Sequence, residues 1–192
     1  MKRRIIVAIS GASGVIYGVR ALQHLRADDT VESHLILSPG AALNLAVETD
    51  YSVDEVKALA DVVHRHDNLA ATIASGSYQA DAMMVIPCSI KSLSGIANSY
   101  ADNLLVRAAD VMLKEMCPLV LVVRETPLHK GHLELMSRAA DYGATILPPV
   151  PAFYHNPTTI EELIDQTVGK VFDCLNIKHD LYRRWGGKKS EN

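Results

Sequence analysis

Short apolar runs alternate with helix-period segments along the whole chain, and this alternation restricts the possible fold more than any other feature. The runs are residues 5–9, 33–37, 83–86, 119–123 and 144–147. Runs of this kind are typical of strands that are buried on both faces of a parallel sheet. The segments between them carry the apolar spacing of amphipathic helices. We therefore predict an α/β fold: an open, mostly parallel, doubly wound sheet of the Rossmann or flavodoxin-like type.

The length and continuity of the chain favour one domain. Its 192 residues fit a single domain, and no linker or internal repeat divides them. The predicted helices cover 15–25, 39–48, 54–63, 133–143 and 158–174, and a polar loop over 90–95 precedes another helical segment that ends near 115. We assign residues 1–178 to the α/β domain and 179–192 to a C-terminal tail that ends in a polar, mobile stretch.

Charge and cysteine usage exclude several classes of protein. The net charge of -3 favours neither nucleic acid nor an anionic membrane as a partner. No apolar run approaches the roughly 20 residues that span a bilayer. Three scattered cysteines, without C-x-x-C spacing, indicate reduced thiols in a cytoplasmic protein. His64 and His66 could bind a metal from a strand, but no third ligand is evident, so we predict no metal site.

The loops that follow the predicted strands are the expected ligand site, because doubly wound sheets bind ligands beyond the carboxyl ends of their strands. The loop Ser-Gly-Ala-Ser-Gly at 10–14 offers the Ser13 hydroxyl and bare backbone N–H groups to a phosphate. The glycines at 11, 14 and 18 do not form G-x-G-x-x-G. The second strand ends in Ser38 where a dinucleotide fold usually has an acidic residue. These features argue against NAD and favour a mononucleotide such as FMN, or a bare phosphate.

Several charged and aromatic residues are candidates for chemistry, each with a structural alternative. Arg107 and Lys114 are two helical turns apart, roughly 10 Å, and the alternative for Lys114 is an exposed i,i+4 pair with Asp110. Arg124 and Glu125 follow a buried strand, where a guanidinium could hold an anion and a carboxylate could move a proton. The alternative is a surface ion pair between these two neighbours.

Two further candidates come from the loops. Tyr154 lies in a loop stiffened by three prolines, which suggests a binding role, with a core aromatic as the alternative. Cys88 is placed as a nucleophile could be, but no base lies beside it in sequence, so a small buried residue is the better interpretation.

Taken in order, six segments resemble those of the UbiX-type flavin prenyltransferases. They are SGASG, PCSIKSLSGI, RAADVMLKE, RETPLH, PPVPAFYH and RRWG, and the resemblance covers residues 4–187. It implies a flavodoxin-like sheet that binds reduced FMN and joins to it, at N5 and C6, a dimethylallyl group from dimethylallyl phosphate. It further implies no metal, a homododecamer with sites at subunit junctions, and delivery of the product to a UbiD-type decarboxylase.

The resemblance also implies roles for individual residues. The FMN-binding residues would be Gly11, Ala12, Ser13, Ser38, Ser89, Ile90, Lys91, Ser92 and Arg124, with Arg107 in the same polar shell. The prenyl phosphate would be held by Lys114, Arg124, Tyr154 and Lys170, with Ser13 close by. Glu48 and Glu125 would move protons, and Trp185 in the tail would close the site. Ser13, Glu48, Lys114, Glu125 and Tyr154 are the predicted catalytic residues.

The chain departs from the family pattern at three places, and two other functions stay open. Met116 and Cys117 stand where many members have two arginines, Lys170 replaces an arginine, and residues 62–74 lack an aromatic. One alternative is an FMN-binding accessory or carrier subunit of a decarboxylase. The other is an FMN-dependent cysteine-type decarboxylase, but those enzymes carry a P-A-S-A-N-T loop and a Met-Asn motif. This chain has Pro87-Cys88-Ser89 and no Met-Asn pair.

Overall fold

The central element of the structure is a parallel sheet of six strands. The computed structural model describes residues 2–184 and 186. Within them the strands are β1 (Arg3–Ile9), β2 (Val31–Leu37), β3 (Val62–His64), β4 (Ala82–Cys88), β5 (Leu119–Val123) and β6 (Thr145–Ile146). Their order is β3-β2-β1-β4-β5-β6, and every neighbouring pair is parallel. The predicted fold class is confirmed, and the chain order reverses between β1 and β4.

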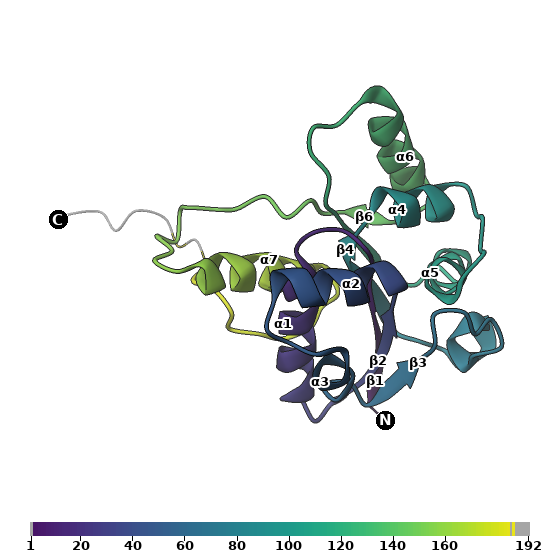
Figure 1. Ribbon diagram of the computed structural model, residues 1–192, viewed down its shortest axis with the longest axis horizontal. Coiled ribbons are helices and arrows are strands. Elements are labelled where there is room, and N and C mark those ends of the chain that lie inside the picture. The colour runs from purple at the N-terminus through teal and green to yellow at the C-terminus, as the bar shows by residue number, and fades with distance from the viewer. Residues whose placement is uncertain (1, 185, 187–192) are drawn as a thin grey trace.

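Helices cover both faces of this sheet (Figure 1). They are α1 (Val15–Arg26), α2 (Pro39–Glu48), α3 (Val53–Lys57), α4 (Ile90–Ala97), α5 (Leu104–Lys114), α6 (Lys130–Asp141) and α7 (Ile160–Cys174), with the 3₁₀ turns η1 (Thr72–Ala74) and η2 (Gly76–Tyr78). Alternate residues of each strand enter opposite cores: Ile5 and Val7 differ by two and share one core, whereas Ile6 enters the other. The first core packs against α1, α2, α3 and α7, and the second against α4, α5 and α6.

Two local predictions were wrong. The predicted helix over 54–63 ends at Lys57, and its last residues belong to strand β3. The carboxylate of Asp61 accepts hydrogen bonds from the backbone N–H and the hydroxyl of Ser33, at 2.7 and 2.8 Å, which draws this segment to the edge of β2. Tertiary pairing therefore outweighs a local helical pattern.

The predicted polar loop over 90–95 is instead the first part of helix α4. Its N-cap residue Ser89 accepts a hydrogen bond from the backbone N–H of Ser92, at 3.3 Å. Leu93, Ile96 and Ala97 form the buried stripe of this short helix. The polar residues at 91, 92 and 94 occupy its other side, so a strand is followed directly by a helix N-terminus.

A glycine sets the distance between α1 and the middle of the sheet. A Cβ atom on Gly18 would lie 2.5 Å from the carbonyl oxygen of Ile86 in β4, closer than any side chain permits. Helix α1 therefore rests against the backbone of β4, next to the point where the strand order reverses. Ligands bind at such reversal points in doubly wound sheets.

The end of the chain returns to α7. Residues 177–184 fold back onto this helix, and Trp185 and residues 187–192 lie outside the described residues. The prediction that Trp185 closes a site and that the tail is mobile falls on those positions. In the part of the chain that is described, no helix is both long and apolar enough to cross a membrane.

Candidate active site

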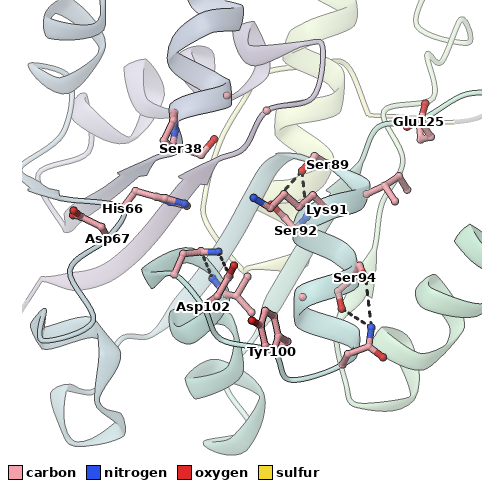
Figure 2. Close-up of a pocket in the computed structure, with 18 residues that line it drawn as sticks. Ser38, His66, Asp67, Ser89, Lys91, Ser92, Ser94, Tyr100, Asp102 and Glu125 are labelled. Carbon is pink, nitrogen blue, oxygen red and sulfur yellow. Dashed lines mark hydrogen bonds between the residues drawn. The ribbon is translucent and has the colours of Figure 1, made fainter.

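A pocket of about 1250 Å³ opens at the strand-order reversal. Its walls are the loops after β1, β2 and β4, the start of α5 and the segment after β3 (Figure 2). Seven predicted site residues line it: Gly11, Ser38, Ser89, Ile90, Lys91, Ser92 and Glu125. Residues that are far apart in sequence thus meet at one crevice, as the position of their loops predicted.

The N-terminus of α4 forms one wall of this pocket. The Ser89 backbone N–H donates to the Ser10 hydroxyl at 2.7 Å, and that hydroxyl donates to the Pro87 carbonyl at 2.9 Å. These bonds fix the turn between β4 and α4. The first N–H groups of a helix have no intrahelical acceptor, so those of Ile90 and Lys91 are available to an anion at the positive end of the helix dipole. Lys91 has no carboxylate within 4.0 Å among the described residues.

The N-terminus of α1 is arranged differently. A carboxylate oxygen of Glu48, at the end of α2, accepts hydrogen bonds from the backbone N–H groups of Gly14 at 2.7 Å and Val15 at 3.3 Å. This places the predicted proton-transfer residue Glu48 beside the exposed Ser13, in the first loop. The positive end of this helix is already in contact with a negative charge.

The loops after β1 and β2 touch each other above the sheet. The Cα of Gly40 would lie 3.0 Å from a Cβ on Gly11, so no side chain fits between them. Ser38 is only 8% exposed, and its hydroxyl oxygen accepts from the backbone N–H of Ala41 at 3.1 Å. Its proton remains available to a ligand in the pocket, because the oxygen acts as the acceptor in this cap.

Arg124 and Glu125 stand at the end of β5. The Arg124 backbone N–H donates to the Cys88 carbonyl at 3.0 Å, which fixes this turn to the end of β4. Burial raises the pKa of Tyr17 in α1, and Thr167 and the Arg124 guanidinium offset part of that rise, so Arg124 lies near the α1–α7 interface. Glu125 accepts from the next backbone N–H, of Thr126, at 2.9 Å. Across residues 2–184 the structure holds no ion pair between Arg124 and Glu125.

Arg107 and Lys114 do not line the pocket. Arg107 donates to the Ala74 carbonyl at 3.1 Å and pairs with Asp110 at 2.9 Å. Lys114, at the far end of α5, pairs with Glu115. The alternative pair of Asp110 with Lys114 does not form, because Asp110 is engaged one turn earlier.

Tyr154 and Lys170 lie at a second location, beside α7. The Lys170 ammonium is 3.5 Å from a carboxylate oxygen of Asp173, one turn later on the helix. Tyr154 is 46% exposed in the proline-rich loop before α7. Neither Tyr154 nor Lys170 lines the pocket.

Sequence reasoning missed one side of the pocket: His66, Asp67, Tyr100, Asp102 and Asn103. The backbone carbonyl of His66 accepts from the N–H of Leu104 at 2.9 Å, and its ring points toward Lys91 (Figure 2). Burial, followed by the charge of Lys91, lowers the pKa of His66. The missed signal was strand β3: had residues 62–64 been read as a strand, the residues after it would have been placed at the crevice.

The Cys88 thiol is not a nucleophile at neutral pH. It is fully buried at the end of β4, and burial raises its pKa to about 12. The His64 ring is hydrogen-bonded to the His34 ring, with 3.0 Å between the two ring nitrogens. Residues 2–184 and 186 contain no group of three or more His, Cys, Asp or Glu side chains that could hold a metal ion.

Comparison with known proteins places the chain among the flavoproteins. Residues 1–182 match the Flavoprotein family. The flavin prenyltransferase UbiX of Salmonella typhimurium is 60% identical over 187 residues, which cover 96% of this chain and 99% of that protein. The chain is therefore a flavoprotein of the doubly wound α/β class. Within that class it belongs to the UbiX family of flavin prenyltransferases.

Solved structures agree with this assignment. A UbiX protein crystallised with FMN and dimethylallyl pyrophosphate has a TM-score of 0.96 and 46% identity, covering 98% of this chain and all of its own. A dodecameric FMN-dependent UbiX-like decarboxylase from Escherichia coli O157:H7 has a TM-score of 0.94 and 47% identity, covering 96% of this chain and all of its own. A peptidyl-cysteine decarboxylase shares only the fold, with a TM-score of 0.63 and 14% identity.

Proposed function

We propose that the protein is a flavin prenyltransferase that joins a dimethylallyl group, taken from dimethylallyl phosphate, to reduced FMN. The observation that carries this proposal is the open N-terminus of α4, which faces a large pocket at the strand-order reversal and is flanked by serine hydroxyls and the Lys91 ammonium. A phosphate-bearing mononucleotide fits such a site, and the family of the chain gives the chemistry.

The residues of the pocket suit FMN. Its phosphate would lie against the first turn of α4, on Ser89 to Ser92, because the first turn of α1 already holds Glu48. Ser38, rather than an acidic residue, stands at the end of β2, which suits a flavin better than a dinucleotide ribose. Gly11, Ala12 and Ser13 would allow the close approach of the flavin, with Arg124 beside it. Arg107 would support this shell by fixing the segment at Ala74.

The side chains beside α7 suit the departing phosphate. Breaking the carbon–oxygen bond places negative charge on the leaving oxygens, and Arg124, Lys170 and the Tyr154 phenol would stabilise that charge. Reduced FMN supplies the nucleophilic N5 and the C6 carbon to which the prenyl group is joined. Glu48 and Glu125 would hold and pass protons near the reacting atoms. Exclusion of water by the pocket would protect an allylic cation.

A second copy of the chain would complete the site. Lys114 lies at the far end of α5 from the pocket, beside Met116, which is 93% exposed. We propose a homo-oligomer, a dodecamer as in the Escherichia coli relative, in which Lys114 reaches the prenyl phosphate of a neighbouring subunit. The product would pass to a UbiD-type decarboxylase. Three free cysteines suit the cytoplasm as the location of this enzyme.

The decisive experiment is a mass spectrum of the flavin that is released after anaerobic incubation of the protein with FMN, a reductant and dimethylallyl phosphate. We expect a gain of one C5 unit, which disappears when any component is omitted. Lys114→Ala and Tyr154→Phe should bind FMN normally but release it unmodified. Unmodified flavin from the wild-type protein would overturn the proposal in favour of a carrier subunit, and flavin-dependent loss of carbon dioxide from a cysteine peptide would favour the cysteine decarboxylase.

A further inference from the structure

Asp173, in the last turn of α7, is surrounded by donors from the returning chain. Its carboxylate accepts from the Tyr182 hydroxyl at 2.5 Å, from His179 Nε2 at 3.0 Å, and from the two terminal nitrogens of Arg184 at 2.7 and 3.3 Å. The Lys170 ammonium lies 3.5 Å away. One carboxylate therefore joins α7 to three residues of the segment 177–184.

These contacts make Asp173 a strongly stabilised anion at an unfavourable position. Burial alone would raise the pKa of Asp173, but the hydrogen bonds from Arg184, Tyr182 and His179 outweigh it and hold the pKa far below its usual range. A carboxylate near a helix C-terminus also faces the negative end of the dipole. The Lys170 and Arg184 cations, which pair with Asp173, offset that repulsion.

The segment 177–184 is held against α7 in one orientation. The His179 Nδ1 accepts from the Leu181 backbone N–H at 3.2 Å, which leaves its Nε2–H to donate to Asp173. A Cβ on Gly169 would lie 2.6 Å from the Tyr182 ring, so that ring packs directly on the helix backbone. Packing and hydrogen bonds together fix where the Tyr182 hydroxyl and the Arg184 guanidinium lie.

The cluster adjoins the predicted phosphate residues. Lys170 belongs to both, and Tyr154 is close enough to Tyr182 and Arg184 to act on the pKa of each. Burial and the Asp173 carboxylate raise the pKa of Tyr182 more than Tyr154 does. The hydrogen bond to Asp173 raises the pKa of Arg184 more than Tyr154 does. Two cations and one carboxylate leave a net positive charge, with a phenol at its edge.

We propose that Asp173 is a positioning residue that holds Lys170, Tyr182 and Arg184 together as a preassembled anion-binding corner beside Tyr154. Without Asp173 the two cations repel each other and their long side chains extend into solvent. The phosphate of the substrate would then have to gather them at the expense of its own binding energy. Arg184 and Tyr182 thereby join the phosphate site.

The identity of the substrate in this proposal rests on the proposed function. The test therefore uses inorganic phosphate, whose binding can be measured without the prenylation reaction. Asp173→Asn removes the charge but keeps the shape of the side chain. Asp165→Asn is the matched control, because Asp165 lies on the same helix and forms a 2.7 Å ion pair with Arg20, on α1. Inorganic phosphate binding and hydrogen exchange of residues 177–184 are measured on the full-length oligomer.

We expect Asp173→Asn to bind phosphate about tenfold more weakly than wild type and to exchange the Leu181 amide faster, whereas Asp165→Asn behaves as wild type in both. Saturating phosphate should restore protection in Asp173→Asn. In the prenylation assay the KM for dimethylallyl phosphate should rise with little change in kcat or in FMN affinity. Faster exchange with unchanged or tighter phosphate binding would reduce Asp173 to a structural role and overturn the proposal. Absence of prenylation by wild type would count against the function but leave the phosphate result decisive.

Discussion

Helices α1 and α4 both begin directly after a central strand of the sheet, α1 after β1 and α4 after β4. The loop before α1 and the start of α4 both border the same pocket. The first turn of α1 is closed by the Glu48 carboxylate, which accepts from Gly14 and Val15. The first turn of α4 is capped only by its own Ser89, and the pocket lies directly against it.

This difference assigns different tasks to two similar turns. A helix N-terminus that faces a carboxylate has little capacity left for a phosphate, because two anions would compete for the same N–H groups. The open terminus of α4 is the better phosphate site. The α1 loop instead brings Ser13 and Glu48 together beside Gly11, which lines the pocket. We propose that this hydroxyl and this carboxylate act on a substrate bound there.

Ser89→Asp should produce the largest effect. Asp is as good an N-cap residue as Ser, so α4 should still form and the melting temperature should stay within a few degrees. The new negative charge would face the flavin phosphate at close range, and FMN affinity should fall at least about 100-fold, or roughly 3 kcal/mol. Flavin fluorescence quenching measures this change.

Ser52→Asp is the control, since Ser52 is the exposed N-cap residue of α3 and does not line the pocket. It should bind FMN as wild type does. If Ser89→Asp retains wild-type FMN affinity, the flavin phosphate does not lie at α4. The two helix N-termini would then not differ in phosphate binding as we infer.

The sequence predicted most of the sheet because its strands are buried on both faces. Central strands such as β1 and β5 each contain a run of five buried apolar residues, which pack only against apolar neighbours on both faces, so their pattern is unambiguous. The edge strand β3 has three residues, half-exposed, and its pairing depends on Asp61 and Ser33, which are 28 positions apart in sequence. Such a strand has no local signature, and the local helical pattern misled the prediction.

The residues of the site likewise fall into those that the sequence could place and those that depend on tertiary structure. Loops after buried strands could be placed at the crevice from the sequence, and Ser38, Ser89 and Glu125 in these loops do line the pocket. The cap of Glu48 on α1 could not be foreseen, since it depends on where the end of α2 lies in space. The cluster around Asp173 depends likewise on how the chain returns along α7, and its members read as ordinary polar residues in the sequence.

Gly18→Ala should have the next largest effect. It tests whether the close packing of α1 on β4 contributes to the stability of the fold. The new methyl group would lie 2.5 Å from the Ile86 carbonyl, in backbone that cannot move without disturbing β4. We expect a loss of about 2 kcal/mol in the free energy of unfolding, measured by urea denaturation.

Gly95→Ala in α4 is the matched substitution. Its methyl group would meet a side-chain carbon of Val106 at 2.9 Å, and a side chain can shift. The gain in helix propensity, about 1 kcal/mol, should offset that contact and leave stability near wild type. Equal losses in both variants would show that α1 is packed no more tightly than α4.

Glu48→Gln should have the smallest effect and bears most directly on the contrast. The substitution keeps an oxygen that can accept from Gly14 and removes the negative charge at the α1 dipole. We expect the free energy of unfolding to fall by about 1 kcal/mol. FMN affinity should change less than threefold, because the flavin phosphate binds at α4. A marked tightening of FMN binding would mean that Glu48 competes with the flavin phosphate for the N-terminus of α1. The phosphate site would then be at α1 and not at α4.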